Sequence, residues 1–170
     1  MAEPSSVRVG VPSRAPRGPY HDGVSEAEPV DENRRRLSSD ECADLLSRPL
    51  VGVFSTLHPG GWIHSVPVHF LFVDGEVRIL AEAGAVKSRN AVRTGHATLC
   101  VEVTEGPVRS FVSLSGPVTA RRPPPIADLV ALDERYGRTD FSSGWDEGAL
   151  AAALILVLRP RRWIAWADWD

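Results

Sequence analysis

Hydrophobic and polar residues alternate along much of residues 37–170, and this period of two predicts a chain built mainly of strands. Glycine, proline and aspartate bound the alternating segments, and the pair Asp74-Gly75 is typical of a two-residue hairpin turn. The predicted strands cover 50–57, 62–73, 76–81, 97–103, 108–120 and 154–158, with a last apolar segment around 163–166. Six to seven mostly antiparallel strands indicate a mainly β fold, a small β-barrel with short flanking helices.

Four segments break the alternation and favour helices. The predicted helices are 38–48, 86–94 and 126–136, with another short helix just before the strand at 154–158. Ser38 and Glu41 form a capping box at the start of the first helix, and Pro49 ends it. Gly95 ends the second helix, because glycine adopts the left-handed conformation of a helix C-terminus without strain.

Residues 1–36 differ in composition from the rest of the chain. They contain five prolines, six arginines and six acidic residues, but no Leu, Ile, Phe or Trp. Such a segment buries too little apolar area to offset the entropy of ordering it. We therefore predict a disordered N-terminal arm at 1–36, interpreted as a variable or solubilising tail rather than a binding element. A single domain follows at 37–170.

The chain of 170 residues is 43% apolar and 24% charged, with a net charge of −3. Its only basic block is Arg34–Arg36, which argues against a protein that binds nucleic acid through phosphate contacts. The longest apolar run, 149–158, is about half the length that spans a membrane. Two cysteines make neither a disulfide framework nor a zinc site, and no secretory signal is readable. We expect a cytoplasmic protein that binds neither nucleic acid nor membrane.

The long predicted strand at 62–73 has two different faces. Its even positions are all apolar and are expected to face the barrel core; they are Val66, Val68, Phe70 and Phe72. Its odd positions hold both polar and apolar residues; they are Ser65, Pro67, His69 and Leu71. Because proline interrupts a ladder, we expect a break at Pro67 that frees backbone groups for a ligand or a second subunit. An ordinary edge strand without a ligand explains the pattern equally well.

The only lysine of the chain lies at the start of the predicted helix 86–94, within the segment Lys87–Asn90; the other 18 basic residues are arginines. Residues 83–86 offer no side chain that caps this helix, so its first N–H groups lack partners. Lys87 and Arg89 also oppose the helix dipole, which favours anions at this end. A bound phosphate would relieve both features, and we favour it over a solvated basic helix end.

No other set of residues has the spacing of a catalytic or metal site. His64 and His69 fall on opposite faces of their strand, and no pair of histidines has a metal-ligand spacing; we interpret the histidines as structural or exposed. Ser113 and Ser115 have no histidine or carboxylate at the spacing of a nucleophilic triad. Enzymatic chemistry in this chain would therefore need a cofactor.

Three segments, in this order, resemble the split β-barrel family of flavin- and deazaflavin-binding proteins related to pyridoxamine-phosphate oxidase. Leu37-Ser-Ser-Asp-Glu41 resembles the family's opening helix, and Ile63-His-Ser-Val-Pro-Val68 with its hairpin resembles the second strand. The segment 87–103 resembles the phosphate-binding helix and following strand, and is similar to the branch that uses the deazaflavin coenzyme F420. The end of the chain, 159–166, is similar to the last strands. The resemblance covers about 37–166 and implies a split β-barrel.

The resemblance also implies roles for twelve residues. Lys87, Arg89 and Asn90 would hold the cofactor phosphate with help from Ser88, whereas Ser65, Val66, Pro67 and Val68 would line the ring. Leu80, Ala81 and Glu82 would line the other edge of the ring, and His69 stands where this branch often has a bulky aromatic residue. A homodimer with the cofactor between its subunits is implied as well. FMN and coenzyme F420 fit the sequence equally, and the residues that bind pyridoxamine phosphate are not recognisable.

The leading hypothesis is an oxidoreductase that uses FMN or F420 to pass hydride or electrons to or from a small organic substrate. The alternative is a non-catalytic haem, bilin or flavin carrier or sensor on the same fold, which His69 favours. A third interpretation, a cofactor-free scaffold, predicts that Lys87 affects only surface charge. Trp163, Trp166 and Trp169 either cover the ring or plug the barrel end or a dimer interface.

Overall fold

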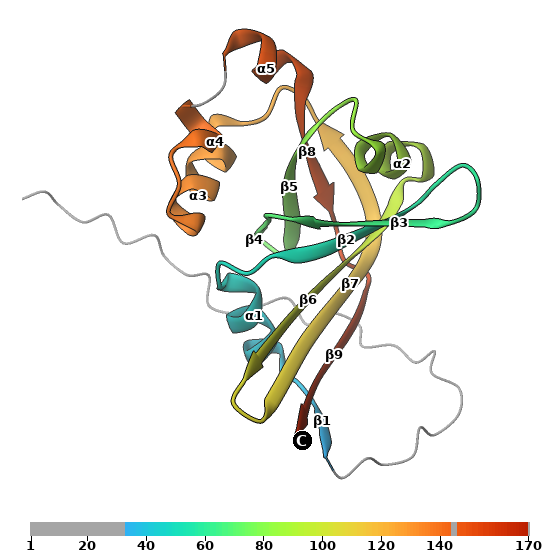
Figure 1. Ribbon diagram of the computed structural model, residues 1–170, viewed down its shortest axis with the longest axis vertical. Coiled ribbons are helices and arrows are strands. Elements are labelled where there is room, and N and C mark those ends of the chain that lie inside the picture. The colour runs from blue at the N-terminus through green and yellow to red at the C-terminus, as the bar shows by residue number, and fades with distance from the viewer. Residues whose placement is uncertain (1–32, 144–145, 170) are drawn as a thin grey trace, which may run out of the picture.

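The computed structural model describes residues 33–143 and 146–169, which form a curled sheet with helices around it (Figure 1). The strands are β1 (Arg34–Arg36), β2 (Gly52–Leu57), β3 (Ile63–Val68), β4 (Leu71–Val73), β5 (Glu76–Glu82), β6 (His96–Glu105), β7 (Val108–Arg121), β8 (Ala153–Leu158) and β9 (Arg162–Trp169). The helices are α1 (Ser39–Ser47), α2 (Val86–Thr94), α3 (Ile126–Tyr136), α4 (Asp140–Ser143) and α5 (Glu147–Ala152). No helix within the described residues is long and apolar enough to cross a membrane.

The sheet is antiparallel and follows the path β3-β2-β6-β7-β8-β5-β4, and β9 and β1 branch from β7. The long strand β7 pairs with β9 as far as Ser115 and with β8 from Val118 onward, which splits the barrel. Gly116 lies at this switch, where a Cβ atom would come within 2.1 Å of the Arg159 carbonyl oxygen. Because β3 and β4 end the path without pairing with each other, the barrel stays open. The predicted split β-barrel is confirmed.

The described residues form nine strands rather than six or seven, because one predicted strand is divided and one lies in the predicted arm. The segment 62–73 forms β3 and β4 with a break at His69 and Phe70, not at Pro67. Pro67 pairs with Val53 of β2 in an unbroken ladder, since a proline is tolerated in an edge strand. The break reverses the expected alternation, so that Leu71 is buried instead of lying on the mixed face.

The prediction that residues 34–36 belong to a disordered arm is wrong. They form β1, which pairs with β9, and the Trp169 N–H donates to the Asn33 carbonyl oxygen (2.8 Å). A strand is held by its backbone, so an edge strand needs no apolar side chains of its own. The remainder of the predicted arm, 1–32, lies outside the described residues.

Local sequence signals predicted the helices well. The Glu41 N–H donates to Ser38 Oγ (3.2 Å) and the Ser38 N–H donates to Glu41 Oε2 (2.8 Å), which confirms the capping box. Helices α2 and α3 have the predicted bounds, and Gly95 ends α2 in the left-handed conformation. The barrel interior is filled by large side chains with no exposure, among them Phe54, Phe70, Ile79, Leu99, Leu114 and Leu156.

Candidate cofactor-binding site

Helix α2 begins without a side-chain cap, as its sequence predicts. Ala85 is the N-cap residue, its side chain accepts no hydrogen bond from the N–H groups of the first turn, and this turn holds no acidic residue. Lys87 is half-buried and Arg89 is exposed, and both belong to this first turn. The opening N–H groups and the two cations therefore form an electropositive helix end, which suits an anion.

The four side chains of the segment Lys87–Asn90 point in two directions. Ser88 is fully buried, and its Oγ donates to the Glu82 carbonyl oxygen (2.7 Å). Asn90 is 3% exposed, and its Nδ2 donates to Thr56 Oγ1 on β2 (3.3 Å). Ser88 and Asn90 thus fasten α2 to the end of β5 and to β2, whereas Lys87 and Arg89 lie on the outer side. Phosphate binding by these residues stays a prediction.

Strand β3, the predicted ring-binding strand, is an edge strand. Ser65 and Pro67 are exposed, Val66 is half-buried and Val68 belongs to the core. Proline has no N–H to donate to β2, so residue 67 occupies a position that is not hydrogen-bonded within the pair. Because the pattern has a period of two, Ser65 also directs its N–H and C=O to the open edge of the sheet. No other strand of the described chain pairs with this edge.

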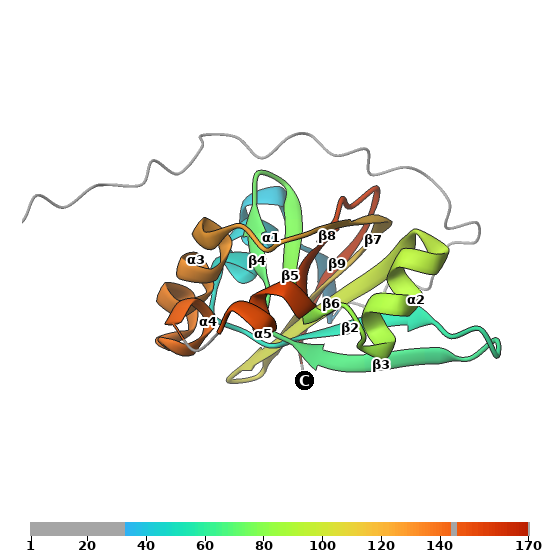
Figure 2. The ribbon, with the colours of Figure 1, turned by 90° about the horizontal axis from the view of Figure 1, so that it is seen from above.

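The structure brings the two predicted groups to the same part of the molecule. Helix α2 packs on β2 and β3, as the two ribbon views show (Figures 1 and 2), and the end of β5 leads directly into α2. Of the residues predicted for the other edge of the ring, Glu82 is exposed, Leu80 is half-buried and Ala81 belongs to the core. The side chains of Val68 and Ala81 are buried, so they are not available to a ring at the surface.

His69 lies in the two-residue break between β3 and β4. Its ring centroid is 4.2 Å from that of Tyr136, at the end of α3. Burial lowers the pKa of His69, the positive charge of Arg138 lowers it further, and Asp140 opposes the shift. These surroundings therefore favour the neutral imidazole.

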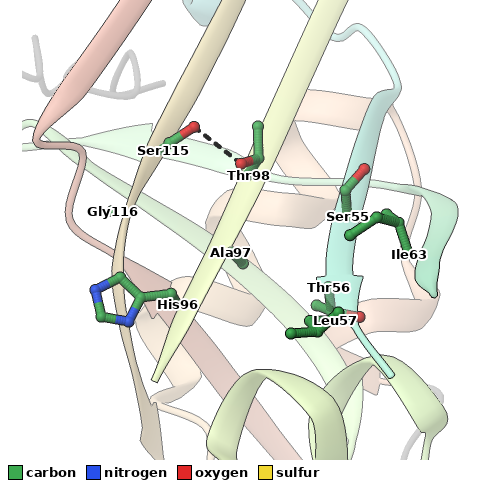
Figure 3. Close-up of a pocket in the computed structure, with 9 residues that line it drawn as sticks. All are labelled: Ser55, Thr56, Leu57, Ile63, His96, Ala97, Thr98, Ser115 and Gly116. Atoms are coloured by element: carbon green, nitrogen blue, oxygen red, sulfur yellow. Dashed lines mark hydrogen bonds between the residues drawn. The ribbon is translucent and has the colours of Figure 1, made fainter. Parts of the chain in front are cut away.

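A pocket of about 250 Å³ lies on the outer face of the sheet, where β2 and β6 separate beyond the pair Ser55 and Thr98 (Figure 3). Its lining residues are Ser55, Thr56, Leu57, Ile63, His96, Ala97, Thr98, Ser115 and Gly116. None of the twelve residues predicted from the sequence lines it. The sequence analysis made no prediction for these positions, because no local signal shows that β2 and β6 diverge here.

Hydroxyl groups cross this outer face in one row. Ser65, Ser55, Thr98 and Ser115 occupy the same register on four neighbouring strands, and Arg162 of β9 follows. Ser55 Oγ and Ser65 Oγ are 2.8 Å apart, and Thr98 Oγ1 and Ser115 Oγ are 2.9 Å apart. The hydroxyls therefore form two hydrogen-bonded pairs. Large apolar side chains stand exposed beside the row: Val53, Leu57, Ile63 and Ile164.

The β1–β9 edge of the same face carries paired charges and aromatic rings. Asp168 accepts from Arg34 Nε (2.6 Å) and from an Arg109 guanidinium nitrogen (2.7 Å), and Arg109 and then Arg34 hold the pKa of Asp168 below its usual range. Arg34 and Arg36 lie over the Trp166 ring, at 5.5 and 5.2 Å from its centroid. Trp163 instead packs edge-on against Phe72, with centroids 5.8 Å apart.

These features define a small split β-barrel protein in which a helix with a basic, uncapped start packs on the open edge strand. The chain belongs to the pyridoxamine 5′-phosphate oxidase family, whose model matches residues 38–167. No curated protein matches the sequence.

Solved structures share the fold at low sequence identity. A conserved hypothetical protein, Rv2991, from Mycobacterium tuberculosis is 23% identical with a TM-score of 0.67, and the match covers 78% of this chain and 85% of that one. An F420 reductase is 22% identical with a TM-score of 0.60, covering 71% and 94% of the two chains. An FAD-binding protein from Mesorhizobium loti is 18% identical with a TM-score of 0.61, covering 81% and 99%.

Proposed function

We propose that the protein is an oxidoreductase that uses FMN or coenzyme F420 to transfer hydride or electrons to or from a small organic substrate. The observation that carries this proposal is that α2, whose start is basic and uncapped, packs on β2 and on the open edge strand β3. A phosphate-bearing flavin or deazaflavin needs an anion site and a flat polar edge within reach of each other. Family membership and the F420 reductase and FAD-binding structural neighbours support the same class.

The residues fit such a cofactor in the following way. Lys87, Arg89 and the opening N–H groups of α2 bind the phosphate. Within the segment Ser65 to Val68, the Ser65 N–H and C=O and the Pro67 C=O hydrogen-bond the polar edge of the ring, and the end of β5, Leu80 to Glu82, lies against its other edge. The bound cofactor supplies the hydride or electron chemistry. The protein contributes orientation and phosphate anchorage, and Ser88 and Asn90 keep α2 in place for this task.

The proposal includes a homodimer that pairs through the outer face of β3, β2 and β6. Exposed Leu57 and Ile63 flank the pocket there, and 63% of Ile63 is exposed. Each hydroxyl pair beside them shares one hydrogen bond, which lowers the desolvation cost when a second copy covers this face. The paired charges of the β1–β9 edge suit the polar rim of such an interface.

Titration of the purified protein with FMN and with F420, followed by fluorescence, tests the proposal. Replacing Lys87 by alanine removes one charged hydrogen bond to the phosphate, which is worth about 1.5–3 kcal/mol. We therefore expect the Kd to rise by about tenfold or more. Arg35→Ala is the matched control, because it removes an exposed cation from β1, far from α2 in Figure 1. A wild-type protein that binds neither cofactor overturns the proposal, as does a Lys87→Ala variant that binds like the control.

A second candidate function, carriage or sensing of haem, bilin or flavin without catalysis, is favoured by His69. Its neutral imidazole, at a break between two strands, has the protonation state that an iron ligand requires. Reconstitution with haem distinguishes this candidate from the first. A Soret band that disappears in His69→Ala would support it, whereas turnover of a reduced flavin or F420 with a quinone or enone acceptor supports the oxidoreductase.

A further inference from the structure

The two ends of the open sheet meet at a short crossing. Strand β3 ends at Val68 and β4 begins at Leu71, so only His69 and Phe70 join the first and last strands of the sheet path. No ladder pairs β3 with β4, although both lie at the opening of the barrel. The backbone groups of the crossing therefore need partners from outside the sheet.

Tyr136, the last residue of α3, supplies these partners. The Phe70 N–H donates to Tyr136 Oη (3.0 Å), and the Tyr136 hydroxyl lies 3.1 Å from the Phe70 carbonyl oxygen and 2.9 Å from that of Leu50. One phenol thus ties the crossing to the segment that leads into β2. A phenylalanine would fill the same volume but would leave three backbone groups without this partner.

Arg135 strengthens the same connection. Its guanidinium donates to the carbonyl oxygens of Leu46 (2.7 Å) and Arg48 at the end of α1, and it lies 4.7 Å from the centroid of the Phe70 ring. The end of α3 therefore holds α1, the entry to β2 and the crossing together. In Figure 2, α3 and α4 lie on the side of the barrel away from α2, so this connection acts on β3 from the end that α2 does not reach.

We propose that Tyr136 is the positioning residue for the ligand-binding edge, and that it fixes residues 65–69 at the distance from the start of α2 that the cofactor requires. This inference rests on the proposed function. Tyr136 acts through Phe70 and through the ring of His69, 4.2 Å away, and does not touch the cofactor itself. Its hydroxyl fixes the position of the end of β3 through Phe70, and its ring fixes the orientation of the His69 side chain.

The test replaces Tyr136 by phenylalanine, which keeps the ring and removes only the hydroxyl. We expect the Kd for the cofactor to rise about tenfold, equivalent to about 1.4 kcal/mol, with a changed absorption spectrum of the bound flavin. Amide hydrogen exchange at Phe70 is expected to become faster than global unfolding allows. Leu132→Ala is the matched control, because it removes a buried side chain of the same helix and leaves the hydroxyl in place. It lowers the Tm but keeps the Kd within about twofold and keeps Phe70 protected until global unfolding.

Each outcome decides the matter. The positioning role is overturned if Tyr136→Phe has the Kd and the bound spectrum of the wild type. It is also overturned if Leu132→Ala loses as much affinity as Tyr136→Phe, because lower stability would then explain the loss in both variants. A wild-type protein that binds no flavin or deazaflavin overturns the proposed function. The failures are distinguishable, because the first two require a wild type that binds.

Discussion

Replacing Gly116 by alanine is expected to weaken the barrel where β7 changes partner. A Cβ at residue 116 would lie 2.1 Å from the Arg159 carbonyl oxygen and 3.0 Å from the Arg161 amide nitrogen. Both are backbone atoms, so only movement of the β8–β9 turn away from β7 relieves the contact. That movement stretches the bonds from the Arg159 N–H to the Pro117 carbonyl oxygen and from the Arg161 N–H to the Ser115 carbonyl oxygen, both 2.9 Å.

The magnitude follows from these two effects. Overpacking costs about 1–3 kcal/mol, and each weakened hydrogen bond adds about 0.5–1.5 kcal/mol. We therefore expect the free energy of unfolding to fall by about 2–6 kcal/mol. For a domain of this size, about 3 kcal/mol corresponds to a Tm lower by about 6–12 °C.

Urea denaturation followed by tryptophan fluorescence measures this change. Gly84→Ala is the matched control, because a Cβ at Gly84 meets nothing within 4 Å; its free energy of unfolding is expected to stay within about 1 kcal/mol of the wild type. The reasoning is refuted if Gly116→Ala unfolds at the same urea concentration as the wild type, or if both variants lose the same stability.

Two further predictions concern a carboxylate and the outer face. The hydrogen bond from Arg35, then that from the Ser38 backbone, lowers the pKa of Glu41 from 4.5 to about 2. Its ion pair therefore stabilises the fold above pH 4.5, and this contribution is lost as the pH falls toward 2. An NMR titration of Glu41 is expected to show a midpoint at about 2 in the wild type and a higher midpoint in Arg35→Ala. A wild-type midpoint at 4.5, the ordinary value for glutamate, would contradict the ion pair. Ile63→Asp is expected to separate the proposed dimer in sedimentation velocity, whereas Val92→Asp, at the equally accessible surface of α2, leaves it intact. A monomeric wild type would refute that interface.

The candidate site was predicted in part. The uncapped, basic start of α2 follows from a few neighbouring residues, because a helix end either has a capping side chain or lacks one. The inward direction of Ser88 and Asn90 could not be predicted, since their partners, Glu82 and Thr56, depend on how α2 packs on the sheet. Tyr136 was missed because its partners, Leu50 and Phe70, are 86 and 66 residues away in the chain.

Features whose cause is local were determined by the sequence alone. The Ser38–Glu41 capping box and the left-handed Gly95 each rest on residues within one helical turn. The hairpin at Asp74 and Gly75 has the positive φ angles that its sequence favours, 55° and 75°. In each case the residues that require a particular backbone conformation and the residues that stabilise it lie in the same short segment. The local sequence is therefore sufficient to predict the structure there.

Only the tertiary structure decided features that depend on distant partners. From the sequence, Pro67 predicts a break in the strand ladder. In the structure the ladder continues through Pro67, because β3 is an edge strand of the sheet. From its composition, Arg34–Arg36 is predicted to belong to a charged arm. In the structure it forms a strand, because it pairs with the edge of β9. The pocket exists because β2 and β6 diverge after Ser55 and Thr98. The physical reason is the same for all three. Strands pair through backbone hydrogen bonds between segments that are distant in the chain, so the local pattern of side chains does not show which strands pair.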